Sequence, residues 1–447
     1  MGREDRLRGD IDHIIRAALA AVSPEACLRR SLVLDGGLLT IGEVPIDLSK
    51  VRRIIVVGAG KASARMAASL ERILGERIDD GLVITADGYE VPTERIVIVE
   101  ASHPVPDERG LAATQRIAQL VDDAGETDLV IVLISGGGSA LLTLPAPGIA
   151  LYDLASVNEQ LLRSGAAIEE VNTVRKHLSQ LKGGKLAARA FPATVISLVL
   201  SDVAGDPLEV IASGPTVADK TSYADAERIL RDYGLWERIP PSVRKHIERG
   251  LNGAIAETPK PGDGVFSRVT TKIIASGRDA AEAALSEAEA LGYHVLLLTT
   301  TLQGEAREIG KILAAIAREE LTSSRPLPLP ALVVAAGETT VTVTGRGKGG
   351  RNQEVALSAA LGIRGIPGAV IASVGTDGRD GPTDAAGGIV DGETISNMHQ
   401  HGIDPAKSLA NNDSYHALAR SGDLLITGPT GTNVADICLI ACGKAPS

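Results

Sequence analysis

Three carboxylates lie close together in a segment rich in glycine. Asp377, Asp380 and Asp384 follow the apolar run 369–374, with a proline and glycines between them. A carboxylate removed from water needs a metal, a cation or a hydrogen-bond donor, and glycine lets another group approach the backbone closely. The same composition also suits an ordinary surface turn. The segment therefore predicts either a turn or a site for a charged ligand, and other segments must decide between them.

A glycine turn with a lysine follows the apolar run 54–57. Lys61 stands there between Gly58, Gly60 and Ser63. Backbone N–H groups at a turn from a strand into a helix favour an anion, and an ammonium adds to that attraction. The spacing nearly fits a dinucleotide-binding fingerprint, with Ser63 in place of the third glycine, and it lacks the Walker pattern. We therefore predict that an anion binds at this turn and contacts Lys61.

A second glycine loop follows the apolar run 129–134. It carries no side-chain obstruction over three residues, so its successive backbone N–H groups can form a nest for an anion such as phosphate. A nucleophile elbow is excluded, because it would need glycine where Leu141 stands. Close packing of a glycine turn against a neighbouring helix is the alternative. The predicted binding residues of this loop are Ser135, Gly136, Gly137, Gly138 and Ser139.

A cationic segment precedes a predicted helix in the C-terminal half. Arg346, Lys348 and Arg351 lie among glycines, a composition that suits a mobile lid. An arginine at a helix entry can clamp a phosphoryl or carboxylate group with two parallel hydrogen bonds. We predict Arg351 as a catalytic residue and the adjacent Asn352 as a binding residue.

These polar loops share one position in the predicted fold. Each follows an apolar run that reads as a buried parallel strand, and ligands bind at the carboxyl ends of such strands. Chance turns account for the whole set less well than they account for any single member. Because Asp202 and Glu338 also follow predicted strands, we add them to the candidate residues. The loops are 58–63, 135–139, 201–206, 337–339, 375–384 and 427–433.

The alternation of strands and helices predicts an α/β fold with doubly wound sheets. A Thr–Val alternation over 340–344 predicts a half-exposed antiparallel strand, which would make the second sheet mixed. The chain has 447 residues, more than one core usually supports. We predict an N-terminal Rossmann-like domain over 1–260 and a C-terminal α/β domain over 265–447, with a cleft between them. The predicted strands are 54–57, 129–134, 195–200, 295–298, 332–335, 369–374 and 424–426.

Composition excludes several classes of protein. A net charge of −11 and 2% aromatic residues argue against a nucleic-acid partner, and no apolar run reaches membrane-spanning length. The first residues lack an apolar signal core, so we expect a cytoplasmic protein. Three cysteines cannot build a disulfide framework, and we expect them in the core.

Taken together, the motifs resemble the type II glycerate kinases, which carry a C-terminal MOFRL domain, here about residues 330–440. The resemblance runs in order over nearly the whole chain, from the Lys61 turn to the loop 428–433. It implies ATP-dependent phosphorylation of D-glycerate, typically to 2-phosphoglycerate, with Mg²⁺. Lys61 and Arg351 match the cationic residues proposed to act in this family, and Asp377 lies in the matching carboxylate loop. Asp202 or Asp377 would then bind Mg²⁺.

Two other functions remain open on the sequence alone. Members of the family have also been labelled hydroxypyruvate reductases, which would use NAD(P)H, although hydride transfer does not call for the carboxylate loop. A protein that senses a small acid without turnover is the third interpretation. The sequence leaves open 2- against 3-phosphorylation, nucleotide preference and whether the chain forms a homo-oligomer.

Overall fold

The computed structural model describes residues 2–443, which form two compact units. We call residues 27–200 with 206–274 the N-terminal unit. The C-terminal unit contains the residues before 27, the short segment 201–205 and the residues from 275 onward. Each unit is built around its own six-stranded sheet.

The sheet of the N-terminal unit has the order β6-β5-β4-β7-β8-β9. Neighbouring strands from β6 to β8 are parallel, and both central strands are buried along their whole length. The chain first adds strands on one side of β4 and then crosses to β7 on the other side. The topological switch point therefore lies between β4 and β7. The strands are β4 (Ile54–Ala59), β5 (Ile78–Ala86), β6 (Val97–Ala101), β7 (Leu129–Ile134), β8 (Thr194–Leu200) and β9 (Val269–Ala275).

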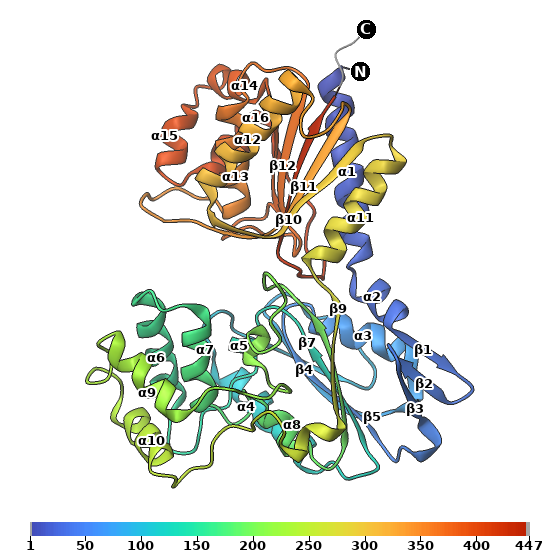
Figure 1. Ribbon diagram of the computed structural model, residues 1–447, viewed down its shortest axis with the longest axis vertical. Coiled ribbons are helices and arrows are strands. Elements are labelled where there is room, and N and C mark those ends of the chain that lie inside the picture. Colours follow the sequence, from blue (N-terminus) through green and yellow to red (C-terminus); the bar gives the residue numbers. More distant parts are fainter. Residues whose placement is uncertain (1, 444–447) are drawn as a thin grey trace. The chain divides into compact units, whose positions relative to one another are not determined.

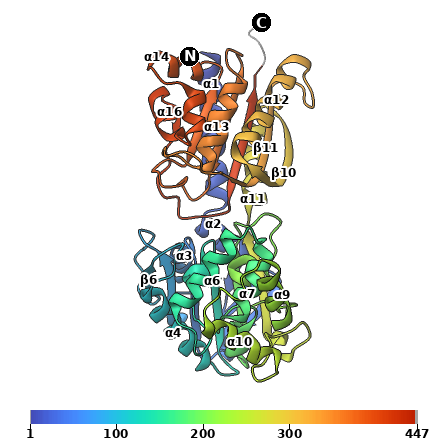
Figure 2. The ribbon, with the colours of Figure 1, turned by 90° about the vertical axis from the view of Figure 1, so that its left-hand side faces the viewer.

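Helices α3 (Ser63–Leu74) and α4 (Glu108–Asp122) connect strands on either side of this switch point. Right-handed crossovers place them on opposite faces of the sheet. Four further helices surround a separate core that includes the buried Tyr223 (Figure 2). They are α6 (Leu151–Arg163), α7 (Ile168–His177), α9 (Tyr223–Asp232) and α10 (Pro241–Leu251).

Shorter elements complete this unit. Three antiparallel strands form a small separate sheet, β1 (Leu32–Asp35), β2 (Leu38–Ile41) and β3 (Val44–Asp47). The short helices are α2 (Pro24–Ser31), α5 (Gly138–Leu141) and α8 (Lys185–Ala190), with 3₁₀ turns at Leu48–Lys50, Gly75–Arg77, Ile211–Ser213 and Gly264–Arg268.

The sheet of the C-terminal unit has the order β10-β11-β15-β12-β13-β14 and is mixed. Strand β15 runs antiparallel to both β11 and β12, and β13 runs antiparallel to β12 and β14. Its strands are β10 (His294–Glu305), β11 (Ala331–Thr340), β12 (Ala369–Gly375), β13 (Gly387–Asp391), β14 (Leu424–Leu425) and β15 (Asp436–Cys442). Its helices are α1 (Arg3–Ala21), α11 (Gly277–Ala290), α12 (Ala306–Ser323), α13 (Arg351–Gly362), α14 (Thr394–Gln400), α15 (Pro405–Ala410) and α16 (Ser414–Ser421).

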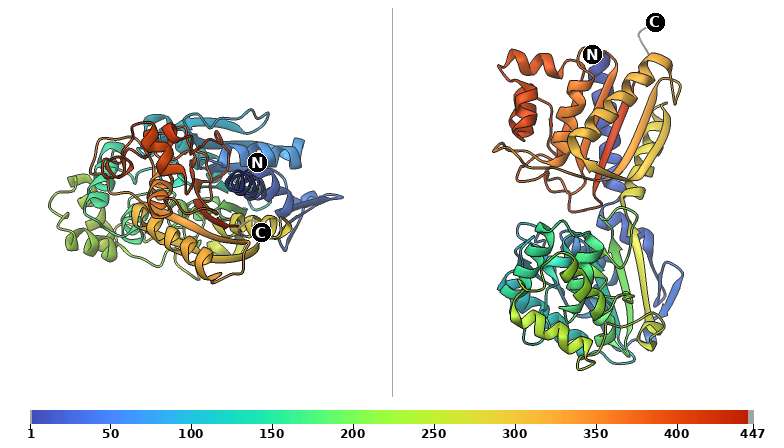
Figure 3. Two further views of the ribbon diagram at one scale, coloured as in Figure 1. Left: turned by 90° about the horizontal axis from the view of Figure 1, so that it is seen from above. Right: turned by 60° about the vertical axis from the view of Figure 1, so that its left-hand side comes forward.

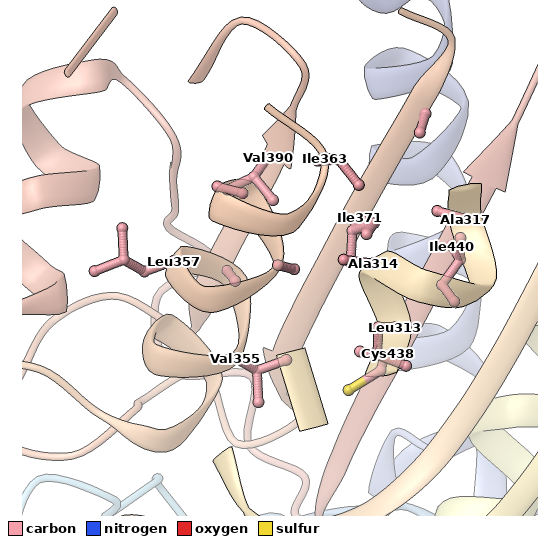
Figure 4. Close-up of a cluster of buried hydrophobic side chains, with 14 of the residues drawn as sticks. Leu313, Ala314, Ala317, Val355, Leu357, Ile363, Ile371, Val390, Cys438 and Ile440 are labelled. Atoms are coloured by element: carbon pink, nitrogen blue, oxygen red, sulfur yellow. The ribbon is translucent and has the colours of Figure 1, made fainter. Parts of the chain in front are cut away.

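Both faces of the second sheet are buried. Ile371 and Ile440 point toward α12 and α13 in a core of aliphatic side chains (Figure 4). The alternate residues Val370 and Leu439 are equally buried. Helices α1 and α11 lie side by side against the sheet (Figures 1 and 3). The first helix of the chain therefore belongs to the core of the C-terminal unit.

The predicted fold class is confirmed: the protein is α/β, with one parallel and one mixed sheet. Each of the seven predicted runs overlaps a strand, namely β4, β7, β8, β10, β11, β12 and β14. The prediction of a strand over 340–344 was wrong, because β11 ends at Thr340. Thr342 donates its backbone N–H and its hydroxyl to the Glu305 carboxylate instead of to a strand. Strands β13 and β15 make the sheet mixed.

The division into units differs from the sequence-based boundary near residues 259–264. The chain passes from that segment into β9, which pairs with β8 and forms the edge of the sheet. The change of unit therefore comes at residues 274 and 275. Helix α1 also joins the C-terminal unit although it opens the chain. An amphipathic helix adds most stability where a sheet face still needs cover, whatever its place in the sequence.

All three cysteines are buried, as expected, and none of them forms a disulfide. Burial raises the pKa of the Cys438 thiol to about 12, which keeps it protonated. Within residues 2–443, no helix is both long enough and apolar enough to cross a bilayer.

We predict that Arg8→Ala destabilises the C-terminal unit. Arg8, on α1, lies 2.5 Å from Asp391 and 2.6 Å from Asp423, and both carboxylates are buried. The substitution would leave them without their cation, and we expect a loss of about 2–4 kcal/mol in the free energy of unfolding, discounted for the partial exposure of Arg8. Urea unfolding followed by circular dichroism measures this. Arg6→Ala is the control, because Arg6 is 75% exposed. Equal losses in the two variants would contradict the assigned role of Arg8.

Candidate functional site

The two predicted anion loops of the N-terminal unit lie side by side at the switch point. Strands β4 and β7 pair with Ala59 opposite Ile134, so the loops that follow them leave the sheet together. The backbone N–H of Lys61 donates to the carbonyl of Gly136 at 2.8 Å, and that of Ala62 donates to the Ser135 hydroxyl at 3.0 Å. The structure thus brings these loops into direct contact.

Close packing accounts for several of the glycines. A Cβ atom on Gly58 would lie 2.2 Å from the carbonyl oxygen of Leu133, and one on Gly60 would lie 2.2 Å from the Ser135 hydroxyl. A Cβ on Gly138 would lie 2.9 Å from that of Ala212. These positions exclude a side chain for reasons internal to the fold. The packing alternative for the second loop is therefore partly correct.

The serines of these loops divide into two groups. Ser63 and Ser135 are buried, and their hydroxyls lie 3.0 Å apart, so they join the loops. Ser139 is half-buried and lies 3.0 Å from the hydroxyl of Ser213. Ser213 donates to Asn172 at 2.9 Å. Of the predicted serines, Ser139 is the one placed at the surface of the loop.

Lys61 is half-buried beside the exposed part of the second loop. A Cβ on Gly137 would lie 3.6 Å from Cγ of Lys61 and 3.0 Å from Nε2 of His103. Gly137 has φ +84°, which glycine adopts readily. His103 was not among the predicted site residues. The signal that could have found it is its place just after β6, at the same edge of the sheet.

In the C-terminal unit, Arg351 is held by two carboxylates. Asp436 opens β15 and pairs with Gly337 of β11 and Gly375 of β12. Arg351, the first residue of α13, binds it through Nε at 2.5 Å and Nη2 at 2.8 Å. Its Nη1 lies 3.1 Å from Glu338. Burial lowers the pKa of Arg351, but the attraction of Asp436 outweighs this and raises it above its ordinary value.

The three carboxylates of the 375–384 loop have different surroundings. Asp380 is buried and accepts hydrogen bonds from the backbone N–H groups of Asn352 and Gln353, so it caps α13. Burial raises its pKa to about 6. Asp384 accepts a hydrogen bond from the Tyr415 hydroxyl at 2.7 Å. Asp377 accepts one from the backbone N–H of its own loop at residue 379.

The predicted binding residue Asn352 lies in the interior. Its side chain is 1% exposed, and it donates to Asp380 and accepts from the Ser373 hydroxyl at 2.6 Å. It therefore fixes α13 against β12. We had expected the Asn352 side chain to face a ligand.

Asp202 and Asp377 both contact the segment 428–434. The Asp202 carboxylate accepts a hydrogen bond from the Asn433 amide at 2.9 Å, and the backbone carbonyl of Asp377 accepts one from Thr430 at 3.4 Å. Between residues 2 and 443, no cluster of three or more His, Cys, Asp or Glu side chains could hold a metal on its own.

The cationic loop is held along its length, which contradicts the expected mobile lid. The Asn412 side chain accepts from the N–H groups of residues 344 and 345, and Asp413 accepts from that of Lys348. The Lys348 ammonium lies over the ring of Tyr415. A Cβ on Gly345 would lie 2.1 Å from the Asn411 carbonyl oxygen. Glycine here allows close packing, which has the same signature in sequence as flexibility.

Asn433 lies in the predicted loop 427–433, but Asp436 was not among the predicted residues. The predicted loops all follow the carboxyl ends of strands that were expected to be parallel. Strand β15 is antiparallel to its neighbours, so its amino end lies at the same edge. The available signal was a polar stretch directly before the apolar run 437–442.

Comparisons with known proteins agree on one family. Residues 331–436 match the model of the MOFRL family, and residues 10–248 match that of a domain of unknown function, DUF4147. A glycerate 2-kinase from Pyrococcus horikoshii is 46% identical over 95% of both chains. This chain belongs to the glycerate 2-kinase family. As a member of the glycerate 2-kinase family it is an enzyme.

A solved structure and a relative named as a reductase are also similar to this chain. A crystal structure of a glycerate kinase from Thermotoga maritima matches with a TM-score of 0.86 and 44% identity, over 98% of this chain and all of that one. A putative hydroxypyruvate reductase from Agrobacterium vitis is 46% identical over 88% of this chain and all of its own length. In this member of the glycerate 2-kinase family, the MOFRL region contains Arg351, Asp377 and Asp436.

We predict that Gly60→Ala lowers the free energy of unfolding by more than the strain of its backbone conformation alone would. Gly60 has φ +145°, and the added methyl group would meet Ser135, so steric overlap adds to backbone strain. We expect a loss of about 3 kcal/mol in the free energy of unfolding, measured by urea denaturation. Gly148→Ala is the matched control, because Gly148 has φ +87° in open space, and it should lose about 1 kcal/mol. If the two losses were equal, the packing interpretation of Gly60 would be incorrect.

Proposed function

We propose that this enzyme transfers the terminal phosphoryl group of ATP to D-glycerate with Mg²⁺, giving 2-phosphoglycerate. The observation that carries the proposal is the placement of Lys61. It stands at the switch point of a doubly wound sheet, beside a glycine loop, in a chain of the glycerate 2-kinase family. This is where ligands bind in sheets of this kind.

The reaction sets the requirements for the site. A hydroxyl oxygen of glycerate forms a bond to the terminal phosphorus, the bond from that phosphorus to the bridging oxygen breaks, and ADP leaves. The hydroxyl proton passes to a base. The protein must hold the two oxygens in line and neutralise charge on the transferred group. We assign the Lys61 ammonium to an oxygen of that group, and the backbone of Gly137 and Ser139 to an anionic group beside it.

The donor set suits Mg²⁺ that is shared with a nucleotide. Mg²⁺ in kinases usually takes one or two carboxylates, with phosphate oxygens and water completing an octahedron. Asp202 and Asp377 both contact the 428–434 segment, Asp202 through its carboxylate and Asp377 through its backbone carbonyl, and no larger cluster of ligands exists within residues 2–443. Bound there, the ion would neutralise charge on the phosphate chain. We assign these two residues to it.

The guanidinium of Arg351 is already bound by two carboxylates. Its two hydrogen bonds to the buried Asp436 fix the guanidinium, whereas Glu338 is 50% exposed and lies 3.1 Å from Nη1. We propose that Arg351 keeps Asp436 and exchanges Glu338 for a phosphoryl oxygen. Asp436 would then position Arg351, as a neighbouring carboxylate positions a catalytic histidine.

One assay tests the proposed function. Purified protein receives D-glycerate with ATP and Mg²⁺, and ³¹P NMR distinguishes 2-phosphoglycerate from 3-phosphoglycerate. We expect the 2-isomer and an equal amount of ADP. The 3-isomer alone would refute the assigned position of transfer. Glycerate binding without any phosphorylated product would favour the small-acid sensor.

The reductase is the second candidate, because a relative carries that name and the first loop approaches a dinucleotide fingerprint. The structure favours it less. Asp87, which follows β5 where a ribose-binding acid would stand, is bound bidentately by Arg109 at 2.8 and 3.0 Å. Ser63, at the third fingerprint position, is buried against Ser135. Oxidation of NAD(P)H by hydroxypyruvate in the same preparation would support the reductase.

We predict that Lys61→Ala lowers kcat about 100-fold or more, because it removes a cation from the transferred group. The half-buried side chain is assigned no role in packing, so the free energy of unfolding should stay within about 0.5 kcal/mol of wild type. Steady-state kinetics and urea unfolding measure the two effects. Lys50→Ala is the control, since Lys50 is 82% exposed. Activity within a few-fold of wild type would remove Lys61 from the mechanism.

We predict that Asp377→Asn raises the Mg²⁺ concentration needed for half-maximal activity at least about tenfold. The amide preserves the shape of the side chain but loses the charge that holds a hard cation. A Mg²⁺ titration at saturating ATP measures this. Asp384→Asn is the control within the same loop, because the carboxylate of this exposed residue accepts its hydrogen bond from the Tyr415 hydroxyl. An unchanged titration for Asp377→Asn would return that residue to the ordinary-turn interpretation.

A further inference from the structure

Helix α7 presents a polar face toward the second glycine loop of the N-terminal unit. Asn172 and Arg175 are three residues apart on this helix, so they share a face. The buried Asn172 accepts a hydrogen bond from Ser213, whose hydroxyl lies 3.0 Å from that of Ser139. The same helix face is therefore connected to the candidate site.

Arg175 is a cation for which this unit supplies no counter-charge. Its Nε donates to the side-chain oxygen of Asn158 at 3.0 Å. Throughout residues 2–443, no carboxylate forms an ion pair with it, and burial lowers its pKa. The guanidinium still has four N–H donors after this bond, arranged as a flat fork. Arg175 is half-buried, and within residues 2–443 these four donors make no further hydrogen bond.

Lys182 is a second buried cation at the same loop. It is 3% exposed, and its ammonium donates to the backbone carbonyl of Leu142, the residue that follows α5, at 2.8 Å. Burial, followed by the charge of Arg175, lowers the pKa of Lys182 to about 7. Two desolvated cations at one loop are costly unless an anion joins them.

Other buried lysines of this unit have clear structural partners. Lys176 lies 3.3 Å from the carboxylate of Asp219. Lys185 donates to two carbonyls near the end of α7, and Asp219 and Glu257 lie close enough to raise its pKa against the effect of burial. Arg175 and Lys182 differ from them because no carboxylate completes the pair.

We infer that Arg175 and Lys182 bind the carboxylate of the acceptor substrate. This inference rests on the proposed function, since it names the group that holds glycerate. Two parallel hydrogen bonds from the guanidinium match a planar carboxylate, and Lys182 adds a further donor. A single negative charge suits two cations of which one is close to neutrality at pH 7. The phosphate chain of ATP would bring several charges, and Lys61 with the glycine loop is the better match for it.

The kinetic test separates acceptor from donor. For Arg175→Gln we expect kcat/KM for D-glycerate to fall about 100-fold, mainly through KM, because a charge-assisted bidentate contact is lost. The KM for ATP should change less than about threefold. Arg175→Lys keeps the charge without the fork, so its loss should be intermediate. Arg163→Gln is the control on the neighbouring α6, where Arg163 is 79% exposed and pairs with Glu159.

Calorimetric titration with D-glycerate tests the same site without turnover. We expect wild type and Arg163→Gln to bind it and Arg175→Gln to bind it about 100-fold more weakly. Thermal unfolding checks that the Arg175 variants remain folded. If the wild type binds glycerate but does not phosphorylate it, the proposed function fails while this inference is still tested by the variants. Unchanged glycerate affinity in folded Arg175→Gln, or a rise in the KM for ATP alone, would overturn the inference.

Discussion

Burial of both sheet faces is the constraint on which the rest of the structure depends. The six residues of β7 are all aliphatic and 0–1% exposed, and β12 and β15 are buried in the same way. A charged side chain in the middle of such a strand would lose its water, and even the small hydroxyl of Ser373 in β12 needs the buried Asn352 as its partner. The sheets therefore leave room for chemistry only at their ends, where strands become loops.

The loops at those ends must still pack against one another. Glycine at positions 58, 60 and 138 lets the two loops of the N-terminal unit approach to backbone contact. The shared hydrogen bonds through Ser135 then fix the turn that carries Lys61. Tight packing and function are compatible in these loops. The glycines that exclude side chains are what hold the lysine in one place beside its neighbours.

Sequence patterns predicted the buried strands well, because continuous Val–Ile runs of this length, bounded by glycine, are typical of strands covered on both faces. They failed where the same residue types serve two purposes. The Thr–Val alternation over 340–344 is typical of a strand, but beyond Thr340 the hydrogen bonds of Thr342 to the Glu305 carboxylate replace the ladder. The glycines near Arg346 suggested mobility, but they pack against the segment 411–414.

Within the candidate site, the missed residues have a common physical origin. Asp436 opens an antiparallel strand, so its position at the ligand-binding edge depends on how β15 pairs and not on what precedes it in the chain. Arg175 and Lys182 lie in and after a helix, where basic residues usually face water. Only the tertiary structure shows that burial lowers the pKa of both and that neither pairs with a carboxylate. Local patterns carry no information on such pairing.

The two units differ in the charge that they present near these loops. In the N-terminal unit, Lys61, Arg175 and Lys182 are cations, and the oxygens bonded by Arg175 and Lys182 belong to the neutral Asn158 amide and Leu142 backbone. In the C-terminal unit, Arg351 is outnumbered by Asp436 and Glu338. A basic surface suits a bare anion, whereas an acidic one repels it and attracts a cation or a metal-bound phosphate. A kinase for an acidic acceptor must bind two anions that repel each other. In the proposed arrangement, the acceptor carboxylate would have its own pair of cations and the donor would have a metal held by carboxylates, which would meet that requirement with different chemistry for each substrate.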